Sequence, residues 1–498
     1  MHSNESAPLT GMTSDSVIRR VAPIGFSIGL LLAILSLFML VPALLAVATS
    51  TAGAGEFGFT SLATLAIGLI LFRGFRPVLH SMLPRQMFLL TTTVWVVVSA
   101  VAALPLVFVE HISVTDAFFE TMSGITTTGS TVLVQLDQHA PAILLWRSIL
   151  QWLGGIGFVV MGVAILPFLQ VGGMRLFQTE SSDWSEKAMP RARQVAGSIA
   201  SVYVGLTLAC LLLYVVFGMS LFDAVNHALT TVSTGGYSTS DASFAQFHQA
   251  SLHIVAIVFM LLGGLPFMLY LRHLRDQPLV IFRDEQVRAF LVFVLAASAF
   301  LAAWLSLTGQ ADAPRALLLA TFNVVSVVTT TGFATDDYTT WGQLPVVAFF
   351  YLTFVGGCSG STSGGMKIFR FQLAVRLLHS QLLQLAYPRR VVPNTYNGRV
   401  VGDDIMRSVV AFSFAFFATI GVLAMFLSSL GLDGVTSLSA AATAVTNVGP
   451  GLGEIVGPAG NFASLPDAAK WALSAGMLMG RLEVMTVLVL LTAGFWRG

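Results

Sequence analysis

Charged residues are scarce in this chain of 498 residues. Lys, Arg, Asp and Glu make up 10% of it and hydrophobic residues 55%, whereas about 25% of the residues in a typical soluble domain are charged. The net charge of +1 gives no sign of a nucleic-acid partner. The composition is that of an integral membrane protein.

Cysteine is also scarce, and so are residue clusters that carry enzyme chemistry. The two cysteines, Cys210 and Cys358, lie in apolar or glycine-rich segments, so no disulfide framework is implied. No predicted helix carries paired carboxylates or a His and Glu cluster suited to metal chemistry. No nucleotide-binding motif is present either. We therefore expect a protein that is not an enzyme and that binds no cofactor.

Long apolar runs are the most abundant feature of the sequence. A helix of about 20 apolar residues crosses the hydrocarbon core of a bilayer, and runs of this length recur along the chain. The first run is longer than the hydrophobic region of a signal peptide, which has about 7–15 residues. We predict spanning segments at residues 24–48, 57–72, 88–109, 142–168, 196–218, 250–271, 288–307, 344–380, 405–430 and 470–496.

The connections between these segments alternate in charge. Arginines concentrate in one set, whereas the other set is acidic and holds only three basic residues, Arg147, Arg315 and Lys470. Because Lys and Arg favour cytoplasmic loops, we assign the first set to the cytoplasm. An even number of spans then places both termini in the cytoplasm. The acidic outer charges, Glu120 among them, are interpreted as a consequence of this topology.

The acidic connections form an internal repeat. They are long and half apolar, and they cover residues 110–141, 219–249, 308–343 and 431–469. Each begins with a stretch suited to a short helix and then breaks into Thr and Gly. A spanning helix, a half-length helix, a polar turn and another spanning helix therefore follow one another four times, which is the signature of a repeat architecture.

The glycine of each polar turn anchors an alignment of the four repeats. The strings ETMSGITTTG, NHALTTVSTG, NVVSVVTTTG and AAATAVTNVG end at Gly129, Gly235, Gly332 and Gly449. Most residues directly before these glycines carry hydroxyl groups. Nine positions before the glycines stand Glu120, Asn226, Asn323 and Ala440.

Four such turns can form the wall of a cation filter. Irregular backbone is tolerated at membrane depth only where it is buried or lines a watery cavity, and inward carbonyls can replace the hydration shell of a cation. The alternative is that Thr and Gly merely end apolar helices with local hydrogen bonds. Four matching strings on one side favour the filter, formed by Thr127, Thr128, Gly129, Ser233, Thr234, Gly235, Thr330, Thr331, Gly332, Asn447, Val448 and Gly449.

A second glycine-rich stretch, GGCSGSTSGGMK at residues 356–367, interrupts an apolar run. It does not match a phosphate-binding loop, because Met366 follows Gly365 and Ile follows Lys367. Such a stretch breaks a helix inside the bilayer, which is sustainable beside water or an ion path. The alternative is a row of small residues for tight helix packing. We interpret the stretch as a movable loop.

Two further residues are candidates for function. Arg481 lies about 16 Å into the last predicted span at 1.5 Å per residue, where a charge usually faces a cavity or a partner. It either faces an ion path or pairs with Glu483 to lock helices together. His227, in the string NHALTT, is interpreted as a packing residue of its short helix rather than a proton relay.

The chain resembles the Trk-type potassium uptake subunits, including TrkH, TrkG and, more distantly, KtrB and the plant HKT transporters. The strings that carry the resemblance are ITTTGS, TTVSTGGYST, VVTTTGFAT, TNVGPGLGE, RSILQWLGGIGF, LLGGLPF, GGCSGSTSGGMK and GRLE. The resemblance implies an all-α polytopic membrane protein with four pseudo-fourfold units around one ion pore. It divides the chain into an N-terminal extension with a helix pair (1–86) and four units (87–175, 176–280, 281–385 and 386–498).

The resemblance also implies a function. It predicts potassium uptake across the bacterial inner membrane by a homodimer in lipid, regulated by a cytosolic TrkA-like nucleotide-binding ring. Gly129 stands where serine accompanies sodium transport, so K⁺ selectivity through filter carbonyls is implied. Arg481 opposes cation passage until the gate moves, and the gate comprises Gly356, Gly357, Gly360, Ser361, Thr362, Gly364, Gly365, Lys367 and Arg481.

An active carrier is the competing class. It would be a proton- or sodium-coupled symporter with alternating access, in which broken helices form a site at the membrane midplane. Inverted repeats would place corresponding breaks on opposite sides of the membrane, whereas the four turns here lie on one side. The sequence therefore favours a gated, channel-like pore.

Overall fold

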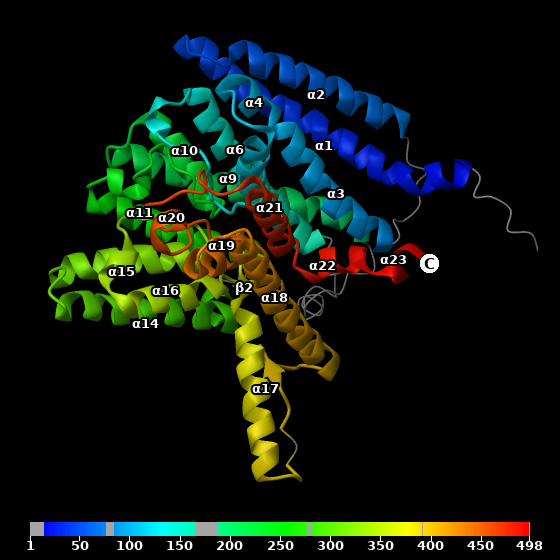
Figure 1. Ribbon diagram of the computed structural model, residues 1–498. Coiled ribbons are helices and arrows are strands. Elements are labelled where there is room, and N and C mark those ends of the chain that lie inside the picture. Colours follow the sequence, from blue (N-terminus) through cyan, green and yellow to red (C-terminus); the bar gives the residue numbers. More distant parts are fainter. Residues whose placement is uncertain (1–13, 76–83, 165–187, 276–279, 391, 498) are drawn as a thin grey trace, which may run out of the picture.

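The apolar runs fold into helices, as the sequence predicts (Figure 1). The computed structural model describes residues 14–75, 84–164, 188–275, 280–390 and 392–497. Within these ranges, seven helices are long and apolar enough to cross a membrane, or up to nine if each bent pair is one span. The chain is an all-α polytopic membrane protein.

Four units with the same helix order make up most of the fold. Each has a spanning helix, a half-length helix and a second apolar helix: α3 (Pro84–Ala102) with α4 (Leu104–Glu110), α5 (Val114–Ile125) and α6 (Pro141–Ala164); α9 (Ala188–Val216), α10 (Leu221–Val232) and α11 (Ala250–Gly263); α14 (Glu285–Leu307), α15 (Ala313–Val328) and α16 (Gln343–Phe354); α18 (Asp403–Ser429), α19 (Gly434–Thr446) and α21 (Asp467–Arg481).

The remaining elements lie within these units, between them or after them. They are α12 (Phe267–Arg275), α13 (Val280–Arg283), α17 (Ile368–Ala386), α20 (Gly453–Val456), α22 (Met485–Leu488), α23 (Ala493–Arg497), the strands β1 (Val355–Gly356), β2 (Met366–Lys367), β3 (Thr395–Tyr396) and β4 (Arg399–Val400), and the 3₁₀ turns η1 (Leu136–Gln138), η3 (Ser243–Gln246), η4 (Tyr338–Trp341) and η5 (Val489–Leu491). β1 pairs with β2 in parallel, and β3 pairs with β4 in antiparallel fashion.

An additional helix pair precedes the four units. Helices α1 (Ser14–Thr49) and α2 (Ala54–Gly74) run side by side along one edge of the molecule, and α1 packs on α3 and α6 (Figure 1). Glycines bring the two helices close together, because a Cβ atom at Gly68 would lie 2.9 Å from the backbone nitrogen of Ala33. This pair is the N-terminal extension that the sequence predicts.

Polar caps fix where the half-length helices begin. The side chains of Ser113, Ser220 and Asp433 each accept hydrogen bonds from backbone N–H groups in the first turn of α5, α10 and α19. Such caps satisfy donors that a helix start otherwise leaves unpaired. The same local chemistry therefore starts three of the four half-length helices.

The half-length helices and the second apolar helices of the four units alternate around a closed circle. Successive contacts join α5 to α6, α6 to α10, α10 to α11, α11 to α15, α15 to α16, α16 to α19, α19 to α21 and α21 back to α5. Each half-length helix is thus held between the second apolar helix of its own unit and that of the preceding unit. The circle directs the four polar turns toward a common centre.

Two predicted spans are broken rather than continuous. The segment 250–271 bends by 92° between α11 and α12, and the segment 470–496 bends by 108° after α21. At the first break, the carbonyl groups of Gly263 and Gly264 accept hydrogen bonds from Thr362 and Cys358. Because these distant residues supply partners for the freed backbone groups, the apolar sequence alone does not reveal the bends.

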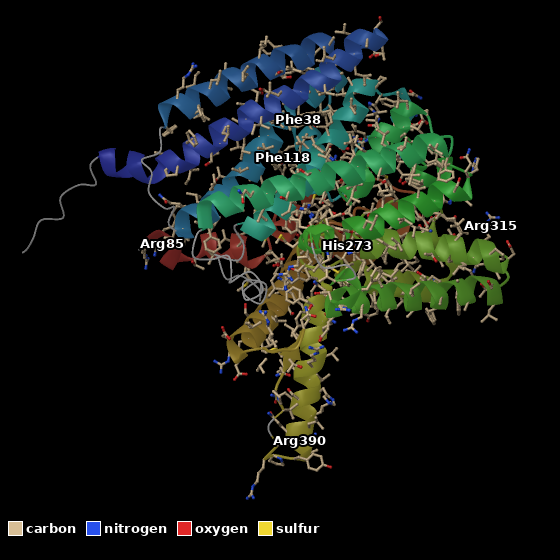
Figure 2. All side chains as sticks on the ribbon, turned by 180° about the vertical axis from the view of Figure 1, so that it is seen from behind. Phe38, Arg85, Phe118, His273, Arg315 and Arg390 are labelled. Atoms are coloured by element: carbon tan, nitrogen blue, oxygen red, sulfur yellow. The ribbon has the colours of Figure 1, made fainter. Side chains whose placement is uncertain are left out.

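The third unit ends in an interruption that the sequence does predict. Helix α16 stops at Phe354, residues 356–367 form a loop, and α17 then projects away from the body, with Arg390 at its far end (Figure 2). Arg85 and Arg315, which the charge pattern assigns to opposite sides of the membrane, lie at opposite ends of the helical body (Figure 2). The loop is therefore held inside the body, while the basic segment after α17 extends from it.

A polar seam closes the circle between the fourth unit and the first. Lys470 Nζ lies 2.6 Å from the Asp116 carboxylate, and Trp471 stacks on Phe118 at 4.7 Å between ring centroids. The Phe462 N–H donates to the Thr131 carbonyl (2.9 Å). Residues far apart in the chain therefore join its last unit to its first half-length helix.

We expect Lys470→Met to lower the melting temperature of the detergent-solubilised protein. The side chain of Lys470 is only 6% exposed, and an ion-paired hydrogen bond contributes about 1.5–3 kcal/mol. Lys470→Arg retains the positive charge and serves as the matched control. A Lys470→Met variant that melts like the parent would show that packing alone closes the seam.

Candidate functional site

The four polar turns share one backbone conformation. Each half-length helix ends and is followed by a residue with left-handed backbone angles: Thr127 (φ 54°), Thr234 (52°), Thr330 (57°) and Asn447 (56°). The next N–H in each turn donates to a carbonyl five residues earlier, as from Thr128 to Ser123 (2.9 Å) and from Val448 to Thr443 (3.1 Å). This is the Schellman pattern of helix termination.

A glycine with positive φ follows in every turn, and it corrects the alignment of the second one. The equivalent glycines are Gly129 (φ 87°), Gly236 (79°), Gly332 (83°) and Gly449 (105°). The sequence alignment on Gly235 was therefore wrong by one residue, because nothing local distinguishes the first of two adjacent glycines from the second. With Gly236 as the anchor, the residue nine positions earlier is His227 instead of Asn226.

The turns meet in a ring. A Cβ atom at Gly129 would lie closer than 3.0 Å to the carbonyl oxygen of Gly235 in the second turn. The same overlap would occur between Gly236 and Thr331, between Gly332 and Val448, and between Gly449 and Thr128, the last at 2.7 Å. Each glycine thus contacts the equivalent carbonyl of the next turn, and the fourth turn contacts the first.

All twelve residues predicted from the four strings lie in these turns. We call residues 126–129, 233–236, 329–332 and 446–449 the turn ring; thirteen of its sixteen residues are buried, and Gly129, Gly236 and Gly332 are partly exposed. Most threonine hydroxyls bond within their own turn, as from Thr126 to the Met122 carbonyl (2.6 Å). The hydroxyls therefore rigidify the turns, while the backbone carbonyls form the contacts between them.

Side chains near the start of each string hold the chain that leaves its turn. Glu120 accepts from the Val132 N–H (2.9 Å), and Asn323 accepts from the Thr335 N–H (3.3 Å). His227 Nε2 lies 3.1 Å from Ser238 Oγ. In the fourth unit the equivalent residue is alanine, and the adjacent Ser439 instead donates to the Leu452 carbonyl (3.2 Å).

The surroundings of His227 favour its interpretation as a packing residue. Its ring is buried and forms edge-on contacts with Phe244 and Phe247. Its Nδ1 lies 2.8 Å from the backbone carbonyl oxygen of Asp223. Both ring nitrogens are thus engaged by neighbours inside the second unit.

The loop 356–367 is hydrogen bonded to the break between α11 and α12. Cys358 and Thr362 donate their N–H groups to Gly264 and Gly263 (2.9 and 3.1 Å), and the Phe267 N–H donates to Gly360 (2.9 Å). Ser361 donates to the Cys358 carbonyl within the loop (2.6 Å). Gly360 and Gly365 have positive φ (77° and 65°). The interruption is therefore an ordered structure with paired backbone groups.

The loop also lies directly against the turn ring. Its Gly364 N–H donates to Thr330 Oγ1 (2.6 Å), and Thr234 Oγ1 donates to Thr362 Oγ1 (3.1 Å). A Cβ atom at Gly364 would lie 2.6 Å from the Thr446 carbonyl oxygen. Three of the four turns thus contact this loop on one side. The other glycines predicted there, Gly356 and Gly357, pack against Gly364 and Ser363 within the loop.

Arg481 joins this loop to the first unit. Its Nη1 donates to the Thr362 carbonyl (2.8 Å) and its Nη2 to the Gly154 carbonyl (3.4 Å). The guanidinium is fully buried and lies 4.1 Å from the Phe158 ring centroid. Lys367 Nζ lies 5.2 Å from the same ring and donates to the Ser363 carbonyl. Two cations therefore flank one aromatic ring beside the loop.

The alternative pairing of Arg481 with Glu483 is wrong. Glu483 forms its ion pair with Arg370 (2.7 Å), and both side chains are buried. Arg370 follows the loop at the start of α17, and its guanidinium stacks on Phe412 at 3.6 Å. Sequence reasoning missed Arg370, because the sequence separation of 113 residues gives no local signal for the pair.

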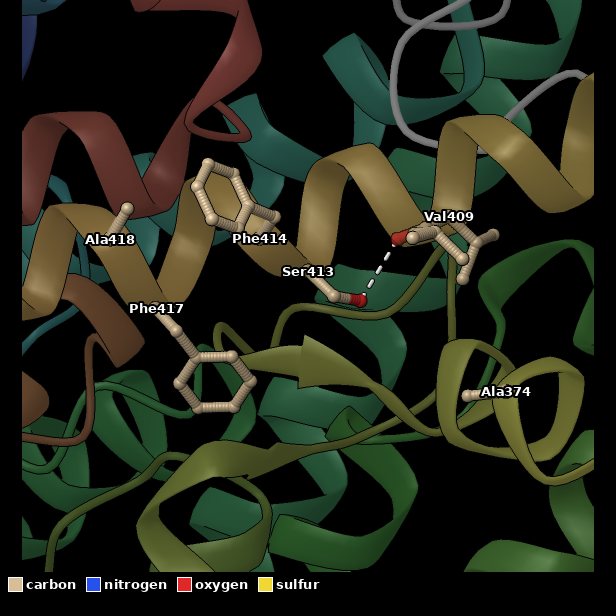
Figure 3. A pocket seen from close by; sticks show the side chains of 7 residues that line it. Ala374, Val409, Ser413, Phe414, Phe417 and Ala418 are labelled. Atoms are coloured by element: carbon tan, nitrogen blue, oxygen red, sulfur yellow. Dashed lines mark hydrogen bonds between the residues drawn. The ribbon is translucent and has the colours of Figure 1, made fainter. Parts of the chain in front are cut away.

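A groove elsewhere on the molecule lacks the features of an ion site. It encloses about 440 Å³ between α17 and α18, and its lining includes Val409, Phe414 and Phe417 (Figure 3). The Ser413 hydroxyl donates to the Val409 carbonyl (2.9 Å; Figure 3). Because the lining is apolar and contains no residue of the turn ring, the candidate site remains the ring with its adjoining loop.

Helices that cross the membrane in four repeated units, with buried turns joined into one ring, define a polytopic membrane transport protein. A model of the family TrkH, described as cation transport protein, matches residues 80–495. The chain belongs to this family.

Individual relatives of the chain belong to the same family. The chain is 54% identical to the Trk system potassium uptake protein TrkI of Halomonas elongata over 96% of its length and 98% of the relative, and 37% identical to TrkH of Escherichia coli over 94% and 98%. The crystal structure of the potassium transporter TrkH from Vibrio parahaemolyticus matches with a TM-score of 0.89 and 35% identity, covering 96% of this chain and 99% of that chain.

Proposed function

We propose that the protein takes up potassium ions through the turn ring, which acts as a selectivity filter. The observation that carries the proposal is the cyclic contact in which each glycine faces the carbonyl of the next turn. Carbonyl oxygens that converge in this way can replace the hydration shell of K⁺. The C-terminal ends of α5, α10, α15 and α19 adjoin the ring, and their partial negative charge favours a cation there.

The loop 356–367 acts as the gate in this proposal. It contacts three turns from one side, and the buried positive charge of Arg481 is bonded to its Thr362 carbonyl. A fixed cation beside the ion path raises the free energy of a passing cation. Displacement of the loop would carry this contact away from the path and permit flux.

The partners of the protein are part of the same proposal. We propose that it works as a homodimer in the bacterial inner membrane, with both termini in the cytoplasm and a TrkA-like nucleotide-binding ring as the regulator of the gate. The distribution of arginines among the connections supports this orientation. The basic segment beyond α17 projects out of the helical body (Figure 2), and its exposed Arg389 and Arg390 offer positive charge to such a partner.

A coupled symporter is the second candidate, because two spans are sharply broken as in many carriers. The breaks at residues 264–266 and 482–484 adjoin the same loop, through Cys358 bonded to Gly264 and Thr362 bonded to Arg481. Inverted repeats would instead distribute such breaks to the two sides of a midplane site. The arrangement therefore favours a pore with a gate on one side.

Uptake of ⁸⁶Rb⁺ by purified protein in lipid vesicles tests the proposal. We expect uptake that follows the electrochemical gradient of the ion, that excess K⁺ inhibits and that Na⁺ inhibits much less. Addition of the cytosolic partner with nucleotide should change the rate without changing this preference. Strict coupling of uptake to a fixed number of protons or Na⁺ ions would establish the symporter instead, and absence of ion-selective uptake would refute both.

A further inference from the structure

A buried ion pair joins the first two turns, and the described residues around the other two turns show no equivalent pair. Arg147 on α6 places its Nε 2.7 Å from the Glu120 carboxylate on α5, and the two side chains are 2% and 0% exposed. Arg147 Nη2 donates to Thr131 Oγ1 after the first turn (3.1 Å), and Nη1 donates to the Ser238 carbonyl after the second (3.3 Å). One guanidinium group is thus hydrogen bonded to the segments that follow both turns.

Neighbouring residues extend this connection into the turn ring. Tyr237 directly follows the second turn, lies under the Arg147 guanidinium at 4.1 Å and donates its hydroxyl to the Glu120 carbonyl (2.7 Å). Gln151, one helical turn beyond Arg147, donates to the Gly235 carbonyl (2.6 Å) and accepts from the Tyr237 N–H (3.0 Å). The Gly235 carbonyl is the one that contacts Gly129 of the first turn.

The second and fourth units carry apolar residues at the equivalent positions. Gly154, Gly263 and Gly480 each pack on the end of the half-length helix of their own unit, so they align α6, α11 and α21. Seven positions before them stand Arg147, Ala256 and Leu473, and three positions before them stand Gln151, Met260 and Met477. Buried apolar residues therefore suffice for packing at these places in the second and fourth units.

We propose that Arg147 and Glu120 are positioning residues that set the spacing between the first two turns and thereby the preference for K⁺ over Na⁺. This inference rests on the proposed function of the turn ring. A buried ion pair adds little net stability compared with apolar side chains of similar size. Its directional bonds instead fix distances, and a cation smaller than K⁺ needs carbonyls that can approach more closely.

Two variants test the inference through the selectivity of ⁸⁶Rb⁺ uptake. Arg147→Lys keeps the charge but loses the forked contacts to Thr131 and Ser238. The double variant Glu120→Leu with Arg147→Leu replaces the pair with apolar side chains, as the second and fourth units have at the position of Arg147, and it is expected to fold because apolar replacements of buried pairs are often neutral. For both we expect the Na⁺ concentration that halves uptake to fall roughly tenfold, which corresponds to about 1.4 kcal/mol.

The controls separate positioning from general stability. Arg376→Lys alters another arginine in an ion pair, with Glu285 at 2.5 Å, away from the turn ring, and should leave the Na⁺ sensitivity unchanged. A purely structural role would lower the yield of folded protein and the maximal rate but not the K⁺ preference. Folded variants with parental Na⁺ sensitivity, or failure of both variants to fold, would overturn the inference. Loss of selective uptake in the parent itself would instead refute the proposed function.

Discussion

Gly236→Ala will abolish potassium uptake, with an expected loss of at least about 100-fold in the initial rate. Gly236 has a φ of 79°, and a Cβ atom there would overlap the Thr331 carbonyl oxygen of the next turn. The left-handed backbone costs about 1–2 kcal/mol with a side chain, and overpacking costs about 1–3 kcal/mol more. The carbonyl must therefore move, and the ring opens at the contact between the second and third turns.

Uptake of ⁸⁶Rb⁺ per folded protein measures this effect, and Gly309→Ala is its matched control. Gly309 has a φ of 70°, but a Cβ atom there would meet no atom within 4 Å. Gly309→Ala therefore has the same unfavourable left-handed backbone angles but no overlap with another turn, and we expect nearly parental uptake. Equal rates for the two variants would show that the glycine contacts between turns are not needed for permeation.

The helices and the four turns could be predicted from the sequence because their signals are local. Apolar runs of sufficient length define the spans, and the repeated strings of threonine and glycine mark where the half-length helices end. The caps at Ser113 and Ser220 also follow from adjacent residues. These features arise within a few residues of one another, so a single sequence contains them.

Features that depend on distant partners could not be predicted. The bends after Gly263 and Arg481 occur within apolar runs, and they are stabilised by the loop from another part of the chain. The charges in the connections assigned to the outer side were interpreted as topology signals. Two of them, Glu120 and Arg147, instead form a buried pair behind the turn ring, because folding brings together residues 27 positions apart.

The same reasoning explains why the second turn was misaligned. Its string contains Gly235 and Gly236 in succession, and only the backbone angles distinguish their roles. Gly235 contributes the carbonyl that contacts Gly129. Gly236 has no side chain, and this allows the Thr331 carbonyl to approach its Cα closely. The two glycines acquire these different roles only when the ring is assembled, so the sequence does not distinguish them.

Arg481→Ala will open a leak, with ⁸⁶Rb⁺ uptake in the absence of any cytosolic partner raised about 10- to 100-fold. The Arg481 guanidinium is fully buried and bonded to the Thr362 carbonyl of the loop. A unit charge about 4 Å from a cation raises its energy by about 4 kcal/mol at an effective dielectric constant of about 20. Alanine removes both this repulsion and the contact that holds the loop beside the ring.

Arg481→Lys is the control, because it keeps the positive charge and should keep most of the barrier. Since the turn ring is unchanged in both variants, the leak through Arg481→Ala should still be inhibited by K⁺ much more strongly than by Na⁺. A leak without this preference would mean that the ring itself has collapsed. Parental flux combined with a lower melting temperature would assign Arg481 to a structural lock between the loop and the first unit, and the electrostatic barrier would then be wrong.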